Sequence, residues 1–170
     1  MPILGEGKGM PVTLTLPRTV VELAKREAEK LGLTLDELFV EIVTRSLDPV
    51  DRAKKYVEAS KDLLEQAKKE LVEGNLRQAA EKLWGAAALA IKAHAYRKEG
   101  RRLSSHRELW EYKGRVVEDL GEWVRDAWAH VNNMHTCFYE GWCTREDVET
   151  ALQQIERLVR GVEARVKNRE

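Results

Sequence analysis

The sequence predicts an all-α protein: an antiparallel up-down helical bundle with an N-terminal extended arm and a short helical hairpin. Three observations lead to this prediction. Apolar residues recur every three or four positions through most of residues 48–166, which is the spacing of amphipathic helices. Glycines and capping motifs divide this pattern into segments with short connections, so consecutive helices become antiparallel neighbours. Alternation with a period of two, which is typical of a strand, is confined to residues 12–16.

The first part of the chain is expected to lie outside the bundle. Residues 1–10, MPILGEGKGM, contain three glycines and are expected to form a disordered tail. In the following PVTLTLP, apolar residues alternate with threonines, which predicts a short half-exposed strand or extended arm. Two short helices separated at Gly32 follow, and Thr34 and Glu37 form a capping box at the start of the second. Residues 11–47 are therefore expected to form an arm and a helix-helix segment.

This order of strand, helix and helix is similar to the ribbon-helix-helix arrangement. In that arrangement two protomers pair their strands, and the outward residues of the strands read the major groove of DNA. The outward residues here would be Thr13 and Thr15, and the nearby basic residues are Lys8 and Arg18. So few basic residues support DNA binding only weakly, and a dimerisation or packing arm is the preferred interpretation of this segment.

Four or five helices are expected in residues 48–166, followed by a tail at residues 167–170. Asp48 and Pro49 mark the first of them, as an N-cap followed by proline at the first helical position. The next helix, about 76–98, carries the small-residue run GAAALAIKAHA. Small side chains allow a neighbouring helix to approach closely, so this helix is expected to be tightly packed.

The second half of the bundle contains one long helical segment and one clear final helix. After the loop EGRRLSS, helical sequence runs from His106 to Tyr139, and a break is expected near Gly114 or Gly121. Thr144 then caps the last helix, whose apolar residues form a regular amphipathic face.

Composition and charge restrict the class of protein. The 29 basic and 29 acidic residues give zero net charge, which argues against a surface coated for nucleic acid but allows a local basic patch. High charge of both signs is typical of thermophilic proteins. No apolar run could cross a bilayer and no signal peptide is visible, so a cytoplasmic protein without a membrane partner is expected.

The sequence contains no motif for a metal or a cofactor. The two cysteines, Cys137 and Cys143, do not have the spacing of a zinc site. We expect them to be two buried thiols, and a disulfide across a turn is the alternative. No nucleotide-binding fingerprint is present, so neither a metal nor a cofactor is predicted.

The segment RDAWAH contains the first candidate site. Asp126 and His130 are four positions apart on one helix, so the carboxylate could orient the imidazole for acid–base chemistry. Arg125 could hold a phosphate through two parallel hydrogen bonds. Arg125 and His130 differ by roughly 140° around the helix, so they do not meet on one straight helix. An exposed arginine beside an Asp-paired histidine is the alternative.

A cluster of basic residues around a loop and a helix start is the second candidate site. Such a cluster could bind RNA phosphates, because helix N-termini also favour anions. A solvated loop is the alternative interpretation. The candidate RNA-binding residues are Arg97, Arg101, Arg102, His106 and Arg107, with Lys98 beside them.

Two long stretches resemble a known family. NLRQAAEKLWGAAALAIKAHAYRKEGRRLSSHRELW and MHTCFYEGWCTREDVETAL are similar to the PaREP family of thermophilic archaea, over about residues 48–165. This family is placed with the HEPN superfamily of helical bundles. The resemblance therefore implies a HEPN-like fold for the main body of the chain.

The HEPN resemblance also implies a chemistry. Many HEPN proteins are metal-independent ribonucleases, with an arginine four to six residues before a histidine, and their site forms where two protomers meet. Arg125, Asp126 and His130 match this motif, which implies a homodimer where Arg125 of one chain meets His130 of the other. The family pattern also emphasises His106 and His135, which form an alternative site.

Three functions follow as hypotheses. The first is a metal-independent endoribonuclease, in which a 2′-hydroxyl attacks the phosphate, with Arg125, Asp126, His130 or His135 as catalytic residues. The second is a non-catalytic interaction module that binds RNA, a nucleotide or a protein partner. The third is a ribbon-helix-helix-type regulator that binds DNA.

Overall fold

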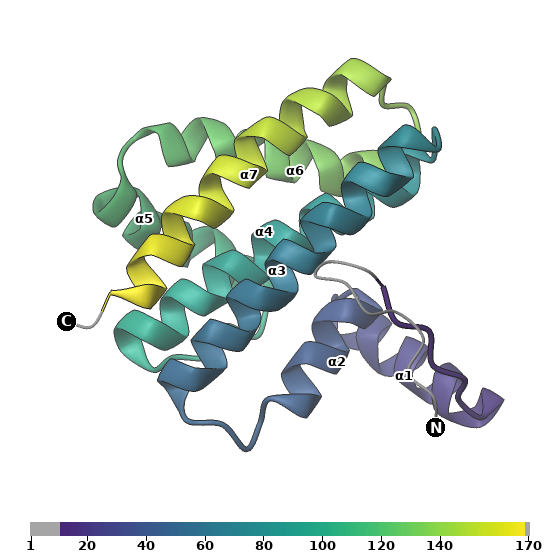
Figure 1. Cartoon of the computed structure of the whole chain (residues 1–170), viewed down its shortest axis with the longest axis horizontal. Coiled ribbons are helices and arrows are strands. Elements are labelled where there is room, and N and C mark those ends of the chain that lie inside the picture. The colour runs from purple at the N-terminus through teal and green to yellow at the C-terminus, as the bar shows by residue number, and fades with distance from the viewer. Residues whose placement is uncertain (1–10, 169–170) are drawn as a thin grey trace.

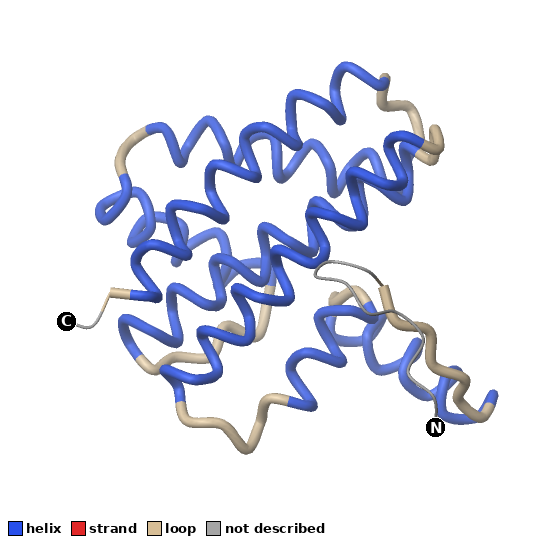
Figure 2. The backbone as a smooth tube through the Cα atoms, viewed as in Figure 1, coloured by secondary structure: helices blue, strands red, loops and turns tan. Residues whose placement is uncertain are grey.

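A computed structural model describes residues 11–168, which contain seven α-helices and no β-strand (Figure 1 and Figure 2). The predicted all-helical fold is therefore confirmed for the described part of the chain. The tail expected at residues 1–10 lies outside the described residues, as do residues 169 and 170. The helices are α1 (Arg18–Leu31), α2 (Leu35–Val43), α3 (Pro49–Val72), α4 (Leu76–Glu99), α5 (His106–Leu120), α6 (Trp123–Glu140) and α7 (Arg145–Lys167).

Local hydrogen bonds fix where several helices begin. Thr34 and Thr144 each form a complete capping box at the starts of α2 and α7. Ser105 also caps α5, because its hydroxyl accepts a hydrogen bond from the backbone N–H of Glu108. The reciprocal contact of a capping box is absent there, since the Glu108 carboxylate accepts from the backbone N–H and hydroxyl of Ser104 instead. The starts of α2, α5 and α7 are therefore fixed by hydrogen bonds between residues three or four positions apart.

Helix α4 is the central helix of the bundle. It packs against α3, α5, α6 and α7, and every residue from Leu83 to Tyr96 is buried. Surrounding helices cover this stretch on all sides, which agrees with the tight packing expected from its small residues. Its small residues allow this: a Cβ added at Gly85 would lie 3.1 Å from a methyl group of Leu63 on α3. The Ser60 hydroxyl donates to the Ala86 carbonyl oxygen at 2.6 Å.

The long helical segment after residue 105 is two helices. The break is at Gly121, whose φ of 121° lies in a region that side chains rarely adopt, whereas Gly114 is inside α5. At the far end of α6, Cys137 and Cys143 form a disulfide across the turn. The expectation of two free thiols was therefore wrong, because Gly141 in the left-handed conformation turns the chain back within bonding reach.

The N-terminal segment lies to one side of the bundle (Figure 1). Residues 11–17 belong to no helix or strand, and Val12–Leu16 pairs with no other segment that the structure describes. Helices α1 and α2 form a hairpin that contacts the bundle mainly through α2. No helix in residues 11–168 has the length and apolarity needed to cross a membrane.

Helix α2 packs against the bundle through its carboxylates. Glu37 is buried and lies 3.2 Å from the ammonium of Lys92 on α4, which is also buried. Asp36 pairs with Lys82 at 2.8 Å, and Glu41 pairs with Arg102. The apolar side chains Phe39, Ile42 and Val43 face solvent instead. Leu38 is buried beside these carboxylates, so the inward side of α2 is mixed apolar and charged, and part of its apolar surface stays outside.

A second buried polar network joins α4 to α5. His94 is almost fully buried, and its two ring nitrogens lie 2.8 Å from the Tyr112 hydroxyl and from the Asp119 carboxylate. Burial lowers the pKa of His94, although Asp119 opposes the shift. A neutral imidazole fits both contacts, since Nε2–H can donate to Asp119 while Nδ1 accepts from Tyr112.

Breaking the buried ion pair is expected to destabilise the fold strongly. Lys92→Met leaves the Glu37 carboxylate buried without a cation, which should cost about 3–5 kcal/mol of unfolding free energy. Urea unfolding measures this cost. Lys54→Met, which breaks an exposed pair with Asp51, is the control and should cost less than about 1 kcal/mol.

The double variant Glu37→Gln/Lys92→Met should be more stable than Lys92→Met alone, because no charge is then left buried. Equal losses in Lys92→Met and Lys54→Met would show that the pair does not hold α2 on the bundle.

Candidate functional site

The Arg-His motif of α6 does not form a site within one chain. Arg125 is exposed and donates to the Glu122 carboxylate at 2.8 Å. Asp126 is also exposed, and no ion pair joins it to His130 in residues 11–168. The carboxylate therefore does not orient the imidazole in this structure. Convergence of Arg125 and His130 across two chains stays a prediction.

The basic residues around the loop after α4 are engaged within the chain. Their guanidinium groups contact carboxylates or backbone carbonyls of several other segments. The contacts are Arg101 with Glu108, Arg102 with Glu41, Arg107 with Glu111, and Arg97 with the carbonyl oxygens of Val166 and Asn168. These contacts tie the loop to α2, α5 and the end of α7, which is a structural role.

The structure brings together the two histidines that the family resemblance implied as an alternative site. His106 begins α5 and His135 lies in α6, and their ring centroids are 4.9 Å apart. Trp84 of α4 contacts both rings, at 5.2 Å from His106 and 4.5 Å from His135. Tyr139 continues the row, 5.0 Å from His135. Three helices thus contribute to one aromatic cluster.

The two imidazoles of this cluster have different surroundings. His106 Nε2 lies 2.8 Å from the carbonyl oxygen of Gly32, so this nitrogen is the donor and carries a proton. Burial lowers the pKa of His135, and the positive charge that His106 can carry lowers it further. Near neutral pH, His135 is therefore held in the uncharged form.

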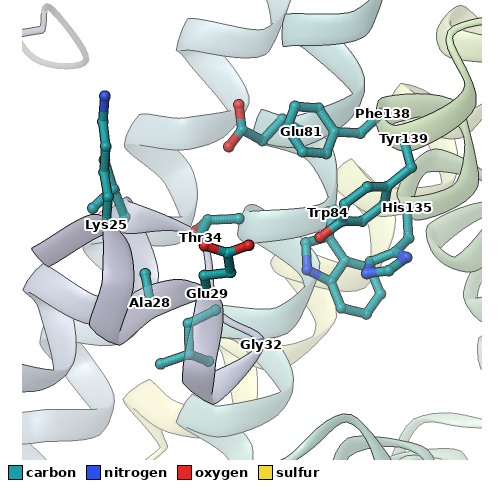
Figure 3. A pocket seen from close by; sticks show the side chains of 12 residues that line it. Lys25, Ala28, Glu29, Gly32, Thr34, Glu81, Trp84, His135, Phe138 and Tyr139 are labelled. Atoms are coloured by element: carbon teal, nitrogen blue, oxygen red, sulfur yellow. The ribbon is translucent and has the colours of Figure 1, made fainter. Parts of the chain in front are cut away.

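The cluster forms one wall of a cavity of about 290 Å³ (Figure 3). The turn between α1 and α2 forms another wall with Gly32 and Thr34, and α4 contributes Glu81 beside Trp84. Burial raises the pKa of the Glu81 carboxyl group. This cavity is where the helical hairpin and the bundle meet, so residues from both parts face one space.

His106 and His135 were predicted from the sequence, whereas Glu81 was not. A signal was present, because Glu81 is three positions before Trp84 and so shares one face of α4 with it. Within the described residues no group of three or more His, Cys, Asp or Glu is placed to hold a metal ion. The cavity is therefore the candidate site that the described side chains support best.

The two histidines are expected to be coupled. Replacing His106 with Gln removes a positive charge and keeps a side-chain donor for Gly32, so the pKa of His135 should rise. The pKa of His135 rises because a nearby cation disfavours the protonated form of the His135 ring, and the substitution removes that cation. NMR titration of the His135 ring measures the shift. A His135 pKa at or above the ordinary value of 6.5 in the wild type would contradict the buried contact.

Comparison with known proteins gives one match. The model of the archaeal PaREP1/PaREP8 family matches residues 55–159, which is more than half of the chain and includes Trp84, His106 and His135. No curated protein matches the chain, and no solved structure matches it. The matched region extends from α3 into α7, so it contains most of the bundle. The chain belongs to the archaeal PaREP1/PaREP8 family.

Proposed function

We propose that the protein is a homodimer that binds duplex DNA through its paired N-terminal segments. The observation that carries this proposal is the orientation of α2. Its carboxylates are held by cations of the bundle and Leu38 is buried beside them, so Phe39, Ile42 and Val43 remain exposed. A second copy of the chain would cover them.

The exposed apolar side chains of residues 12–43 form what we call the N-terminal apolar face. Large exposed apolar groups concentrated in one segment are typical of an interaction surface. Leu14 is 61% exposed and Val43 is 70% exposed, which is far more than a packed helix or arm would leave. The members of this face are Val12, Leu14, Val20, Leu23, Phe39, Ile42 and Val43.

The extended arm favours a second copy over an unrelated partner. Its pattern is apolar, Thr, apolar, Thr, apolar, which reads the same in both directions around Leu14. In an antiparallel pair centred there, each Thr13 lies opposite a Thr15 and the apolar residues share one face. Two-fold symmetry of this kind is the commonest form of homodimer. The paired arms would satisfy the backbone groups that a single chain leaves without partners.

The outward charge of the N-terminal segment suits DNA. Among residues 11–47, three carboxylates face bundle cations, which leaves five basic and three acidic side chains, a net charge of +2 for each chain. None of these eight forms an ion pair within the described residues. Unpaired cations can contact phosphates, while Thr13 and Thr15 face a groove. The five basic residues are Arg18, Lys25, Arg26, Lys30 and Arg45.

The bundle itself would be of the HEPN type, with α3, α4, α6 and α7 in an up-down order, as the family resemblance implies.

A ribonuclease is the second candidate function. The observation that favours it is the contact of His106 with His135 beside an open cavity. A neutral His135 could act as general base, and a protonated His106 could act as general acid.

Substitution in the arm tests the dimer. Leu14→Asp places a charge at the centre of the paired arms and should give a monomer with unchanged helix content, because an unpaired charge resists burial. Light scattering after size-exclusion chromatography reports the mass. Val72→Asp changes a residue that is 82% exposed outside the N-terminal apolar face, so it should remain a dimer. A monomeric wild type would contradict the proposal.

DNA binding is tested by its dependence on salt. Arg18→Ala should lower the slope of log affinity against log salt by about one for each chain, measured by fluorescence anisotropy with duplex DNA. Lys69→Ala removes an exposed cation of α3 and should leave the slope unchanged. If wild-type protein binds no duplex even at low salt, the proposed function is wrong.

The ribonuclease candidate has its own test. A pool of single-stranded and structured RNA, incubated with EDTA, should yield 2′,3′-cyclic phosphate ends if two histidines catalyse the cleavage. Loss of cleavage in His135→Ala and His106→Ala, with activity kept in His130→Ala, would assign the reaction to the aromatic cluster. The reverse pattern would assign it to Arg125 and His130 of a dimer. Intact RNA with wild-type protein removes this candidate.

A further inference from the structure

The cavity between the hairpin and the bundle has a size and a shape suited to a small ligand. Its volume of about 290 Å³ is near the lower end of ligand sites in proteins, roughly 300–1,000 Å³. Its walls come from α1, the α1–α2 turn, α4 and α6, so a ligand would touch both parts of the chain. Trp84 forms a buried floor, with 4% exposure, whereas Tyr139 is 63% exposed at the opening.

One side of the cavity is aromatic. Figure 3 shows the rings of Trp84, His135 and Tyr139 gathered together, with Phe138 close by. Trp84 contacts His135 at 4.5 Å, and His135 contacts Tyr139 at 5.0 Å between ring centroids. The faces of Trp and Tyr rings carry partial negative charge, so they attract cations.

The other side carries two carboxylates. In Figure 3, Glu29 and Glu81 lie between the aromatic rings and Lys25. Neither carboxylate has an ion pair or a hydrogen bond within residues 11–168, although Lys25 also lines the cavity. This contrasts with α2, where Asp36, Glu37 and Glu41 are all held by cations of the bundle. Burial raises the pKa of Glu81 and the charge of Lys82 opposes that shift, but the Lys82 ammonium donates to Asp36. Glu29 is exposed, so neither carboxylate is bonded to a cation.

The charge of the cavity walls favours a positively charged ligand over a neutral or negatively charged one. A phosphate or carboxylate ligand would face Glu29, Glu81 and a His135 that burial keeps uncharged. A neutral ligand would remove water from Glu81 without replacing it by a partner, which costs free energy. A cation would pair with the carboxylates and contact the ring faces at the same time.

We propose that this cavity is a binding site for a small organic cation, a primary amine or guanidinium carried on an apolar or aromatic group. The charged end lies between Glu29 and Glu81, and the apolar part lies against Trp84 and Tyr139. This site requires neither DNA binding nor RNA cleavage, because its walls are complete within one chain. A bound ligand would join the hairpin to the bundle and so stabilise their contact.

A matched set of three compounds tests the charge. Phenethylamine, 2-phenylethanol and phenylacetate share a ring and a two-carbon scaffold but are positive, neutral and negative at pH 7.5. Isothermal titration calorimetry and thermal unfolding of the full chain should show binding of the amine and little or none of the other two. Equal binding of all three compounds, or preference for the anion, overturns the proposal.

Isosteric substitutions test the residues. Glu81→Gln should weaken binding of phenethylamine by about tenfold, which corresponds to one ion pair with reduced access to water. Glu29→Gln/Glu81→Gln should abolish it while circular dichroism stays unchanged. Glu118→Gln alters a carboxylate that is 74% exposed on α5 and should bind as the wild type does.

Two results would overturn the proposed cation site. Amine binding that survives in the double variant places the ligand elsewhere and overturns the assignment. Failure of agmatine, spermidine and phenethylamine alike to stabilise the wild type at millimolar concentration overturns the ligand class. Either result leaves the tests of the dimer and of DNA binding unaffected, since those depend on Leu14 and Arg18.

Discussion

The buried ion pair between Glu37 and Lys92 fixes how the two parts of the chain meet. Both side chains are almost fully removed from water, so each depends on the other to offset the cost of burying a charge. Glu37 also accepts from the backbone N–H of Thr34, which ties the start of α2 to the same carboxylate. One residue thus sets where α2 begins and which side of it faces the bundle.

Two consequences follow from that orientation. Phe39, Ile42 and Val43 of α2 are left exposed, as are Val12 and Leu14 before α1. The turn before α2 is brought over α4 and α6, where it closes one side of the cavity beside Trp84. The proposed surface for a second copy and the proposed ligand site therefore depend on the same packing of the hairpin.

Helix α4 makes this arrangement possible because it is surrounded on all sides. Its small residues bring α3 close, and its few large or polar residues each reach a different neighbour. Trp84 reaches the histidines, Lys92 reaches α2, and His94 reaches Tyr112 and Asp119 of α5. A helix that is buried on all sides can carry such groups only where each finds a partner, since an unpaired buried polar group costs free energy.

The sequence by itself determined the helical class, several helix starts and the glycine stops, because capping boxes and amphipathic spacing are local and involve residues three or four positions apart. It also singled out His106 and His135. Only the tertiary structure decided that these rings meet at Trp84, that Cys137 bonds Cys143, and that α2 turns its carboxylates inward. Pairing of charges far apart in the chain overrides the amphipathic pattern there, because a buried carboxylate needs a cation that local sequence does not reveal.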